Sequence, residues 1–271
     1  MRPGRRPERP LLLRHAEHML EKPPIAAPLH NGAPEGVEEA ERQGFAQLYE
    51  RLRRAVLTGE FVPGSVVSQV ELARAYNVSR APLREALRML QMEGLVIAEP
   101  GRRSRIAAVS AADLEQLYAL RITVEALAVR LTVPRLNGND SARLRELLAE
   151  MDDLAGTRDF DSWEVPHRAF HRALVSGSGE RVVGTIEELS DHAYRYRRSL
   201  LEQPRAWQIV AAEHRGIVDA VEAGDADVAA GRLAAHLATT ALTVCAGLTP
   251  EHDPVGVREA LRVVLSTVER R

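Results

Sequence analysis

Four histidines are the residues of this chain whose type and spacing most clearly suggest chemistry. His167 and His171 are four residues apart, so in a helix both imidazoles project from the same face. His214 and His236 lie on two consecutive predicted helices and are equidistant from the turn at Gly224-Asp225. In an antiparallel hairpin each would lie about 16 Å from that turn, so the two rings should face each other.

The sequence around His171, His214 and His236 is apolar, which predicts that these side chains point into a core. Four unpaired imidazoles in one core would be costly without a common partner. A divalent metal such as zinc or nickel is the simplest such partner, and we expect all four histidines to bind it. The alternative is a set of separate histidines, each hydrogen-bonded within the core and none bound to metal.

A row of arginines is the second group with chemical potential. Arg80, Arg84 and Arg88 are spaced by four residues and share one face of a predicted helix, whose opposite face is apolar. Exposed guanidinium groups near a helix N-terminus can bind guanine O6 and N7 or clamp phosphate in a major groove. The alternative is a solvated charged face on which Arg84 and Arg88 pair with Glu85 or Glu93.

A predicted hairpin after this helix is also basic. Arg102, Arg103 and Arg105 lie beside Gly101, a composition suited to a minor groove. Residues 45–106 contain ten arginines and six glutamates, a charge of +4 in a chain whose net charge is −2. A basic segment joined to an acidic remainder is typical of nucleic-acid-binding modules.

Hydrophobic periodicity places these arginines on a compact module. It predicts helices over 45–58, 69–76 and 79–92, then strands over 95–98 and 105–109 around a turn at 99–103. Ser68 and Ser79 are the predicted N-caps of the second and third helices. Three helices plus a β-hairpin make a winged helix-turn-helix, which we assign to residues 45–109.

The rest of the chain is predicted to be helical, so the protein is mainly α. Residues 110–246 should form an antiparallel all-α bundle of six to seven helices with short connections. Residues 247–271 should form a C-terminal linker and helix, and the Arg/Pro-rich residues 1–44 a disordered tail. The predicted helices are 113–133, 141–154, 163–175, 182–201, 207–223, 225–246 and 255–268.

Composition narrows the class of protein further. The single cysteine, Cys245, permits neither an internal disulfide nor a cysteine-based zinc cluster. No apolar run approaches the ~20 residues needed to cross a membrane, and Leu11–Leu13 is too short for a signal peptide. We therefore expect a cytoplasmic protein with no membrane partner.

The basic module resembles the GntR family of bacterial transcription regulators. The resemblance implies that Arg80 and Arg84 contact DNA from the recognition helix, with Ser79 and Ala81 at its start and Gly101 at the tip of the wing. The stretches that carry it are Val67–Ala73, Val78–Leu87 and Glu93–Val96. Three positions depart from the family pattern, and these departures affect which operator sequence is expected but not DNA binding itself. They are Val70, Ala81 and Arg103.

The helical segment resembles the FCD effector domain, which places the chain in the FadR-type branch of that family. Metal-binding relatives use an aspartate and three histidines, and the histidines correspond to His171, His214 and His236. The aspartate position is His167 here, so one negative charge is lost and metal affinity or preference should differ. The matching stretches are Leu117–Arg121 with Glu125, Phe170–Leu174, Glu213–Ile217 and Ala220–Leu237.

A ligand pocket is expected beside the metal. Arg121 and Glu125 are four residues apart on an apolar helix face, so both should point inward. An inward arginine near a metal suits a small carboxylate that bridges the two. His192 and Tyr196, with Arg195 or Arg197, are expected to complete this effector-binding pocket. The alternative for Arg121 and Glu125 is an ordinary ion pair within the helix.

These features predict a homodimeric, ligand-responsive transcriptional regulator that binds a double-stranded operator and senses a small carboxylate metabolite. Of the two signs of regulation, a repressor is favoured over an activator. Two other classes stay open: a histidine-metal hydrolase or other metalloenzyme, and an architectural DNA-binding protein with a purely structural helical domain. The chain has no H-E-x-x-H motif and no nucleophile elbow, which disfavours the enzyme.

Overall fold

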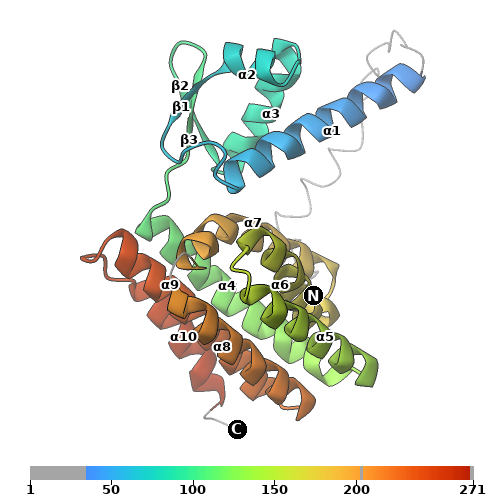
Figure 1. The fold of residues 1–271 in the computed structure, drawn as a ribbon, viewed down its shortest axis with the longest axis vertical. Coiled ribbons are helices and arrows are strands. Elements are labelled where there is room, and N and C mark those ends of the chain that lie inside the picture. The colour runs from blue at the N-terminus through green and yellow to red at the C-terminus, as the bar shows by residue number, and fades with distance from the viewer. Residues whose placement is uncertain (1–34, 202–203, 269–271) are drawn as a thin grey trace, which may run out of the picture. The chain divides into compact units, whose positions relative to one another are not determined.

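A computed structural model describes residues 35–201 and 204–268 of the chain (Figure 1). Most of the predicted tail, residues 1–34, lies outside the described residues. The first helix, α1 (Glu35–Leu57), begins at Glu35 rather than at the predicted Phe45. Residues 35–44 contain no proline and several glutamates, so they can extend the helix without adding to its apolar stripe.

A winged helix-turn-helix forms the first of two separate hydrophobic cores. Its three strands form one antiparallel sheet in the order β1-β3-β2. The sequence pattern does not predict β1, because three residues beside a helix N-cap carry too little periodicity. After α1 the elements are β1 (Val66–Ser68), α2 (Gln69–Ala75), α3 (Arg80–Met92), β2 (Val96–Glu99) and β3 (Arg103–Ile106).

The apolar face of α3 anchors it in this core. Leu83, Ala86, Leu87 and Leu90 are each at most 3% exposed. Their spacing commits one side of α3 to the core, so the opposite side faces solvent. The predicted interior of the module is therefore confirmed.

The two predicted N-caps differ in the structure. Ser68 caps α2, since its hydroxyl accepts a hydrogen bond from the amide of Glu71. Ser79 occupies the N-cap position of α3 but its side chain makes no capping hydrogen bond. The predicted N-cap position at Ser79 is therefore correct, but the predicted capping hydrogen bond is absent.

The second core belongs to a bundle of seven α-helices within residues 111–268. In Figure 1, α9 runs through the bundle, and it packs against α4, α8 and α10. The C-terminal helix belongs to the same core, because Val257 and Val264 are buried in it. The helices are α4 (Ala111–Thr132), α5 (Gly138–Ala155), α6 (Phe160–Val175), α7 (Glu180–Leu201), α8 (Pro204–Glu222), α9 (Ala226–Leu248) and α10 (Val255–Val268).

By length and composition alone, α9 could cross a membrane, contrary to the expectation that no segment could. The apolar part of α9 is 61% buried among its neighbours, which is the ordinary state of a central helix in a bundle. Its apolar character is thus explained by the core, without a membrane.

Candidate functional site

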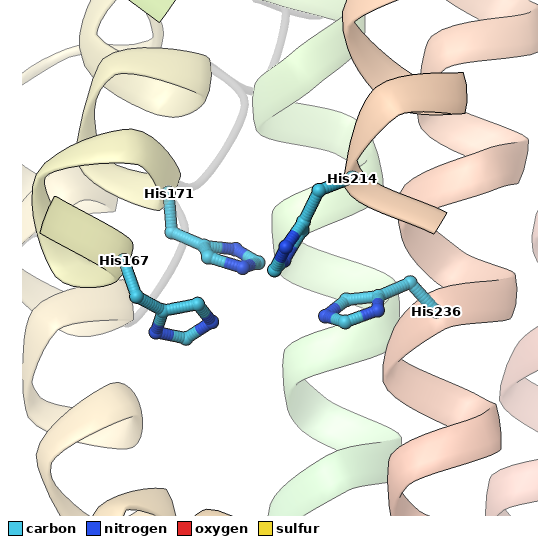
Figure 2. Close-up of side chains that lie close together, drawn as sticks. All are labelled: His167, His171, His214 and His236. Carbon is cyan, nitrogen blue, oxygen red and sulfur yellow. The ribbon is translucent and has the colours of Figure 1, made fainter. Parts of the chain in front are cut away.

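The four predicted histidines come together in the bundle. Figure 2 shows His167 and His171 from α6, His214 from α8 and His236 from α9 with their rings converging. All four are buried, and one nitrogen from each lies within 4.8 Å of the corresponding nitrogens of the others. Ring centroids are 4.5 Å apart for His167 and His171, and 4.6 Å apart for His214 and His236. The predicted juxtaposition is therefore confirmed.

Local sequence accounts for these positions. The i, i+4 spacing puts two rings on one face of α6. The turn between α8 and α9 uses Gly224 at φ +68°, and the Asp225 side chain caps α9 by accepting from the amide of Val228. Because this turn is short, the two helices run antiparallel and bring His214 and His236 level with each other.

Burial favours the neutral form of three of these imidazoles, those of His167, His171 and His214. Desolvation lowers the pKa of His167 and His214 well below the ordinary value, and it lowers the pKa of His171 to about 4. Neutral imidazoles have a lone pair to donate, which is the form that binds metal. The Nε2 atoms of His171 and His214 are buried and have no hydrogen-bond partner in the described chain. A divalent ion would satisfy both, so these residues fit a metal.

Three carboxylates face Nδ1 atoms of the cluster, a position that the sequence pattern did not predict for any of them. His236 Nδ1 lies 2.7 Å from Glu213 Oε2. His167 Nδ1 lies 3.2 Å from Glu164 Oε2, without hydrogen-bond alignment. His171 Nδ1 lies 3.7 Å from Glu125 Oε2, too far for a hydrogen bond.

Carboxylates at Nδ1 leave Nε2 as the ligand atom, as is common for metal-bound histidines. The signals available in the sequence were the i, i+3 spacing of Glu164 and His167, and Glu213 next to His214. Neither signal shows that the carboxylate turns inward, because that depends on packing from other helices.

Arg121 and Glu125 point inward, as expected, and they also form the intrahelical ion pair that was the alternative. Arg121 Nε lies 2.7 Å from Glu125 Oε1, and their side chains are 1% and 0% exposed. They border a cavity of about 140 Å³ that His171 also lines. Arg121 Nη1 is buried without a hydrogen-bond partner in the described chain. A guanidinium donor and a histidine of the cluster therefore meet at one cavity.

His192 and Tyr196 do not line that cavity. The Tyr196 hydroxyl donates to Asp113 Oδ2 at 2.6 Å, and desolvation and this contact raise the pKa of Tyr196 above its usual value. His192 is half-buried on α7 and outside the histidine cluster. The structure thus brings Arg121 and Glu125, but not this second pair, to the cavity beside the cluster.

On the winged module, α3 presents Arg80 and Arg84 to solvent, with Ser79 and Ala81 exposed at its start. Within the described residues neither arginine forms an ion pair. Arg88, in contrast, is paired with Glu85 at 2.6 Å. The interpretation of the row as a charge-paired surface is therefore correct for Arg88 alone.

The turn between β2 and β3 exposes Gly101, Arg102 and Arg103. Gly101 has φ +74°, which suits glycine, whereas Arg102 at φ +60° adopts a conformation that costs most residues roughly 1–2 kcal/mol. The Arg102 carbonyl accepts a hydrogen bond from the amide of Gln69, which ties the turn to α2. Two guanidinium groups are thus held at the tip of the wing.

Comparison with known proteins identifies the class. Residues 45–106 match the model for bacterial regulatory proteins of the gntR family, and residues 116–239 match the FCD domain. The chain is 34% identical over 199 residues to an uncharacterized HTH-type transcriptional regulator in an unstable DNA locus of Streptomyces ambofaciens. The aligned region covers 72% of this chain and 83% of that protein. The chain belongs to the GntR family of transcriptional regulators and carries an FCD domain.

Two further similarities agree with this class. The chain is 31% identical over 154 residues to the HTH-type transcriptional repressor GlaR of Escherichia coli K12, covering 55% of this chain and 70% of GlaR. A crystal structure of a putative GntR transcriptional regulator from Rhodococcus sp. RHA1 matches with a TM-score of 0.63 at 25% identity, covering 74% of this chain and 96% of that chain. The protein is thus a DNA-binding regulator and not an enzyme, and its FCD domain implies a small-molecule ligand.

Proposed function

We propose that this regulator is a homodimeric repressor that senses a small organic acid through a divalent metal ion in its FCD domain. The observation that carries the proposal is the convergence of four buried imidazoles beside a cavity lined by an arginine that has an unpartnered nitrogen in the described chain. GlaR, a relative that is named a repressor, supports the sign of regulation. As a regulator of transcription it would act in the cytoplasm.

DNA recognition is assigned to the exposed side of α3 and to the wing. Arg80 and Arg84 would reach base edges or phosphates in a major groove, with Ser79 and Ala81 close to the backbone of the DNA. Gly101, Arg102 and Arg103 would lie along a minor groove. Two such modules in a homodimer would match a pseudo-palindromic operator.

The metal would be held by His167, His171, His214 and His236. An all-imidazole donor set suits zinc or nickel and disfavours magnesium or calcium, which prefer oxygen. The ion would supply a Lewis-acidic position for a carboxylate, while Arg121 would orient the ligand by a charge-assisted hydrogen bond. Glu125 would hold the Arg121 guanidinium through its Nε atom.

The ligand can alter operator binding only through different affinities for two dimer geometries. We propose that ligand binding favours the geometry that fits the operator worse. The operator can be obtained by selection from random DNA duplexes with the protein itself, and mass spectrometry of the native protein can identify the retained acid. If that acid leaves operator affinity unchanged, the proposed sensing function is wrong.

The DNA surface is tested by Arg84→Ala, which we expect to cost about 1–3 kcal/mol of binding and to relax base preference at one operator position. Arg88→Ala is the matched control, because it removes the same charge one turn along but from an arginine already paired with Glu85. Footprinting and affinity on the selected operator provide the readout. Unchanged affinity and footprint for Arg84→Ala would contradict the recognition-helix assignment.

A further inference from the structure

The helix α4 has an apolar stripe on the side that faces solvent. Leu120, Val124, Leu127 and Leu131 follow one another at intervals of four, three and four residues, so they lie along one side of the helix. Leu120 and Leu127 are 55% and 53% exposed, Leu131 is 37% exposed, and Val124 is partly buried. The stripe is therefore part of the surface of the described chain, although its composition is that of a core.

The solvent side of α4 carries no charge along this stripe. From residue 116 to residue 131 the exposed residues of α4 are Gln116, Leu120, Thr123, Leu127 and Leu131. The next helix, α5, has an ordinary solvated face, whose exposed residues include Arg143, Arg145, Glu146, Glu150, Asp152 and Asp153. A helix that is apolar on its outer side as well as on its core side is typical of a helix that a further partner covers.

The stripe is separate from the histidine cluster and its cavity. Arg121 and Glu125, which line that cavity, are fully buried. They lie on another side of α4, about a third of a turn from the stripe. A partner that packs on the stripe therefore leaves the ligand cavity free.

The spacing of the stripe makes it self-complementary. The centre of its four positions falls between residues 125 and 126. If a second α4 packs antiparallel around a two-fold axis at that point, Leu120 faces Leu131 of the partner subunit. Val124 then faces Leu127 of the partner subunit. A two-fold interface requires a patch that matches itself in this way, whereas an unrelated partner requires no such symmetry.

The charges at the two ends of α4 have opposite signs. Asp113 and Glu115 lie near its start, Arg130 lies near its end, and Arg135 follows it. All four side chains reach the surface at least in part. An antiparallel copy brings the acidic start of one helix to the basic end of the other, whereas a parallel copy would bring like charges together. This charge complementarity favours a second copy of the chain, in antiparallel orientation, as the partner.

We propose that α4 is a dimerisation helix of the effector domain, which packs antiparallel on α4 of a second copy through Leu120, Val124, Leu127 and Leu131. This inference deepens the proposed function and rests on it, since that function includes a homodimer. It adds the surface, the orientation and the residue pairs. Two effector domains joined in this way share a two-fold axis, which is the symmetry of a pseudo-palindromic operator.

Leu120→Glu and Leu131→Arg test the surface. Both positions are exposed in the single chain, so each variant should fold, but a dimer would bury each new charge against leucine twice. We expect the dimer Kd of either variant to rise about 100-fold, tenfold for each of the two buried unpaired charges. Fluorescence-detected sedimentation of the full-length protein over a dilution series measures this Kd. A wild-type Kd in both variants would overturn the proposed interface while leaving a homodimer formed through another surface.

Combining the two substitutions tests the orientation. In Leu120→Glu/Leu131→Arg each glutamate would face an arginine of the other copy, so the Kd should return to within about tenfold of the wild type. Within one chain the two positions lie roughly 16 Å apart along α4, too far for an ion pair. An equimolar mixture of the two single variants should also dimerise, because one contact pairs glutamate with arginine and the other keeps two leucines. No rescue in either experiment would overturn the antiparallel pairing.

Ile209→Glu is the matched control, because Ile209 is 51% exposed on α8 and lies outside the stripe. It should keep the wild-type Kd, and a loss equal to that of Leu120→Glu would contradict the assignment to α4. If circular dichroism shows that the charged variants do not fold, Leu127→Ala decides, because alanine favours the helix and should still raise the Kd about tenfold. An unchanged Kd in Leu127→Ala would then overturn the proposal. A wild-type chain that stays monomeric at every concentration would overturn the homodimer of the proposed function itself.

Discussion

The pair formed by Arg121 and Glu125 allows a stability prediction that separates structure from ligand binding. Arg121→Met leaves the Glu125 carboxylate charged in a site where its side chain is 0% exposed. Removing one partner of a buried ion pair costs about 3–5 kcal/mol, because the other charge is left unsolvated. The double variant Arg121→Met/Glu125→Leu removes both charges and should be close to the wild type in stability.

The pKa of Glu125 shows that the folded chain favours the charged form of this carboxylate. Burial is the largest single influence and would raise this pKa, but Arg121 and His171 together outweigh burial, and the pKa falls from 4.5 to about 2. A shift of this size corresponds to about 3 kcal/mol by linkage. Because the folded-state pKa is depressed, this stabilisation is present above pH 4.5 and is lost as the pH falls towards 2.

Urea unfolding of metal-stripped protein, followed by tryptophan fluorescence, measures the effect. Trp163 and Trp207 are the two tryptophans of the chain, and both are buried in the helical bundle. The control is Arg143→Met/Glu146→Leu, an exposed intrahelical pair on α5 that should change stability by less than about 1 kcal/mol. The reasoning is refuted if Arg121→Met costs less than about 1 kcal/mol, or if the double variant is as unstable as the single one.

Two further predictions concern local structure. Ser68→Ala should destabilise the winged module by about 0.5–2 kcal/mol, because it removes the hydrogen bond that caps α2. Ser79→Ala should leave stability nearly unchanged, because the Ser79 side chain makes no capping hydrogen bond. Urea unfolding followed by circular dichroism compares the two variants, and equal losses of stability would contradict this difference between the caps. Gly177→Ala should cost about 1 kcal/mol or more, because the added Cβ would lie 3.1 Å from the backbone Cα of the buried Thr132. Tryptophan fluorescence during urea unfolding measures this second effect, and an unchanged midpoint would show that the backbone can relax there.

Much of the fold could be predicted from periodicity. The long helices of the bundle, the apolar face of α3 and the hairpin with Gly101 at its turn were all expected. The start of α1 and the strand β1 were not, since neither has an apolar pattern of its own at those positions. Local helix propensity accounts for the start of α1, and pairing with β3 accounts for the formation of β1.

The candidate site could be predicted in part, for reasons that differ between residues. The i, i+4 spacing and the symmetric hairpin fix the histidines, because helix geometry makes them neighbours whatever surrounds them. His192 and Tyr196 were expected at the pocket, but Tyr196 contacts Asp113 instead. Which side of α7 faces the cavity is set by packing against α4, which the sequence of α7 does not contain.

The sequence by itself determined the class of protein, the two modules, the arginines of α3 and the four histidines. Tertiary structure alone decided that Glu164 pairs with Arg197 and that Arg121, although paired with Glu125, has a buried donor without a partner in the described chain. The reason is physical: periodicity along one helix shows which side is buried, but the charge balance of a buried site depends on side chains that several helices bring together.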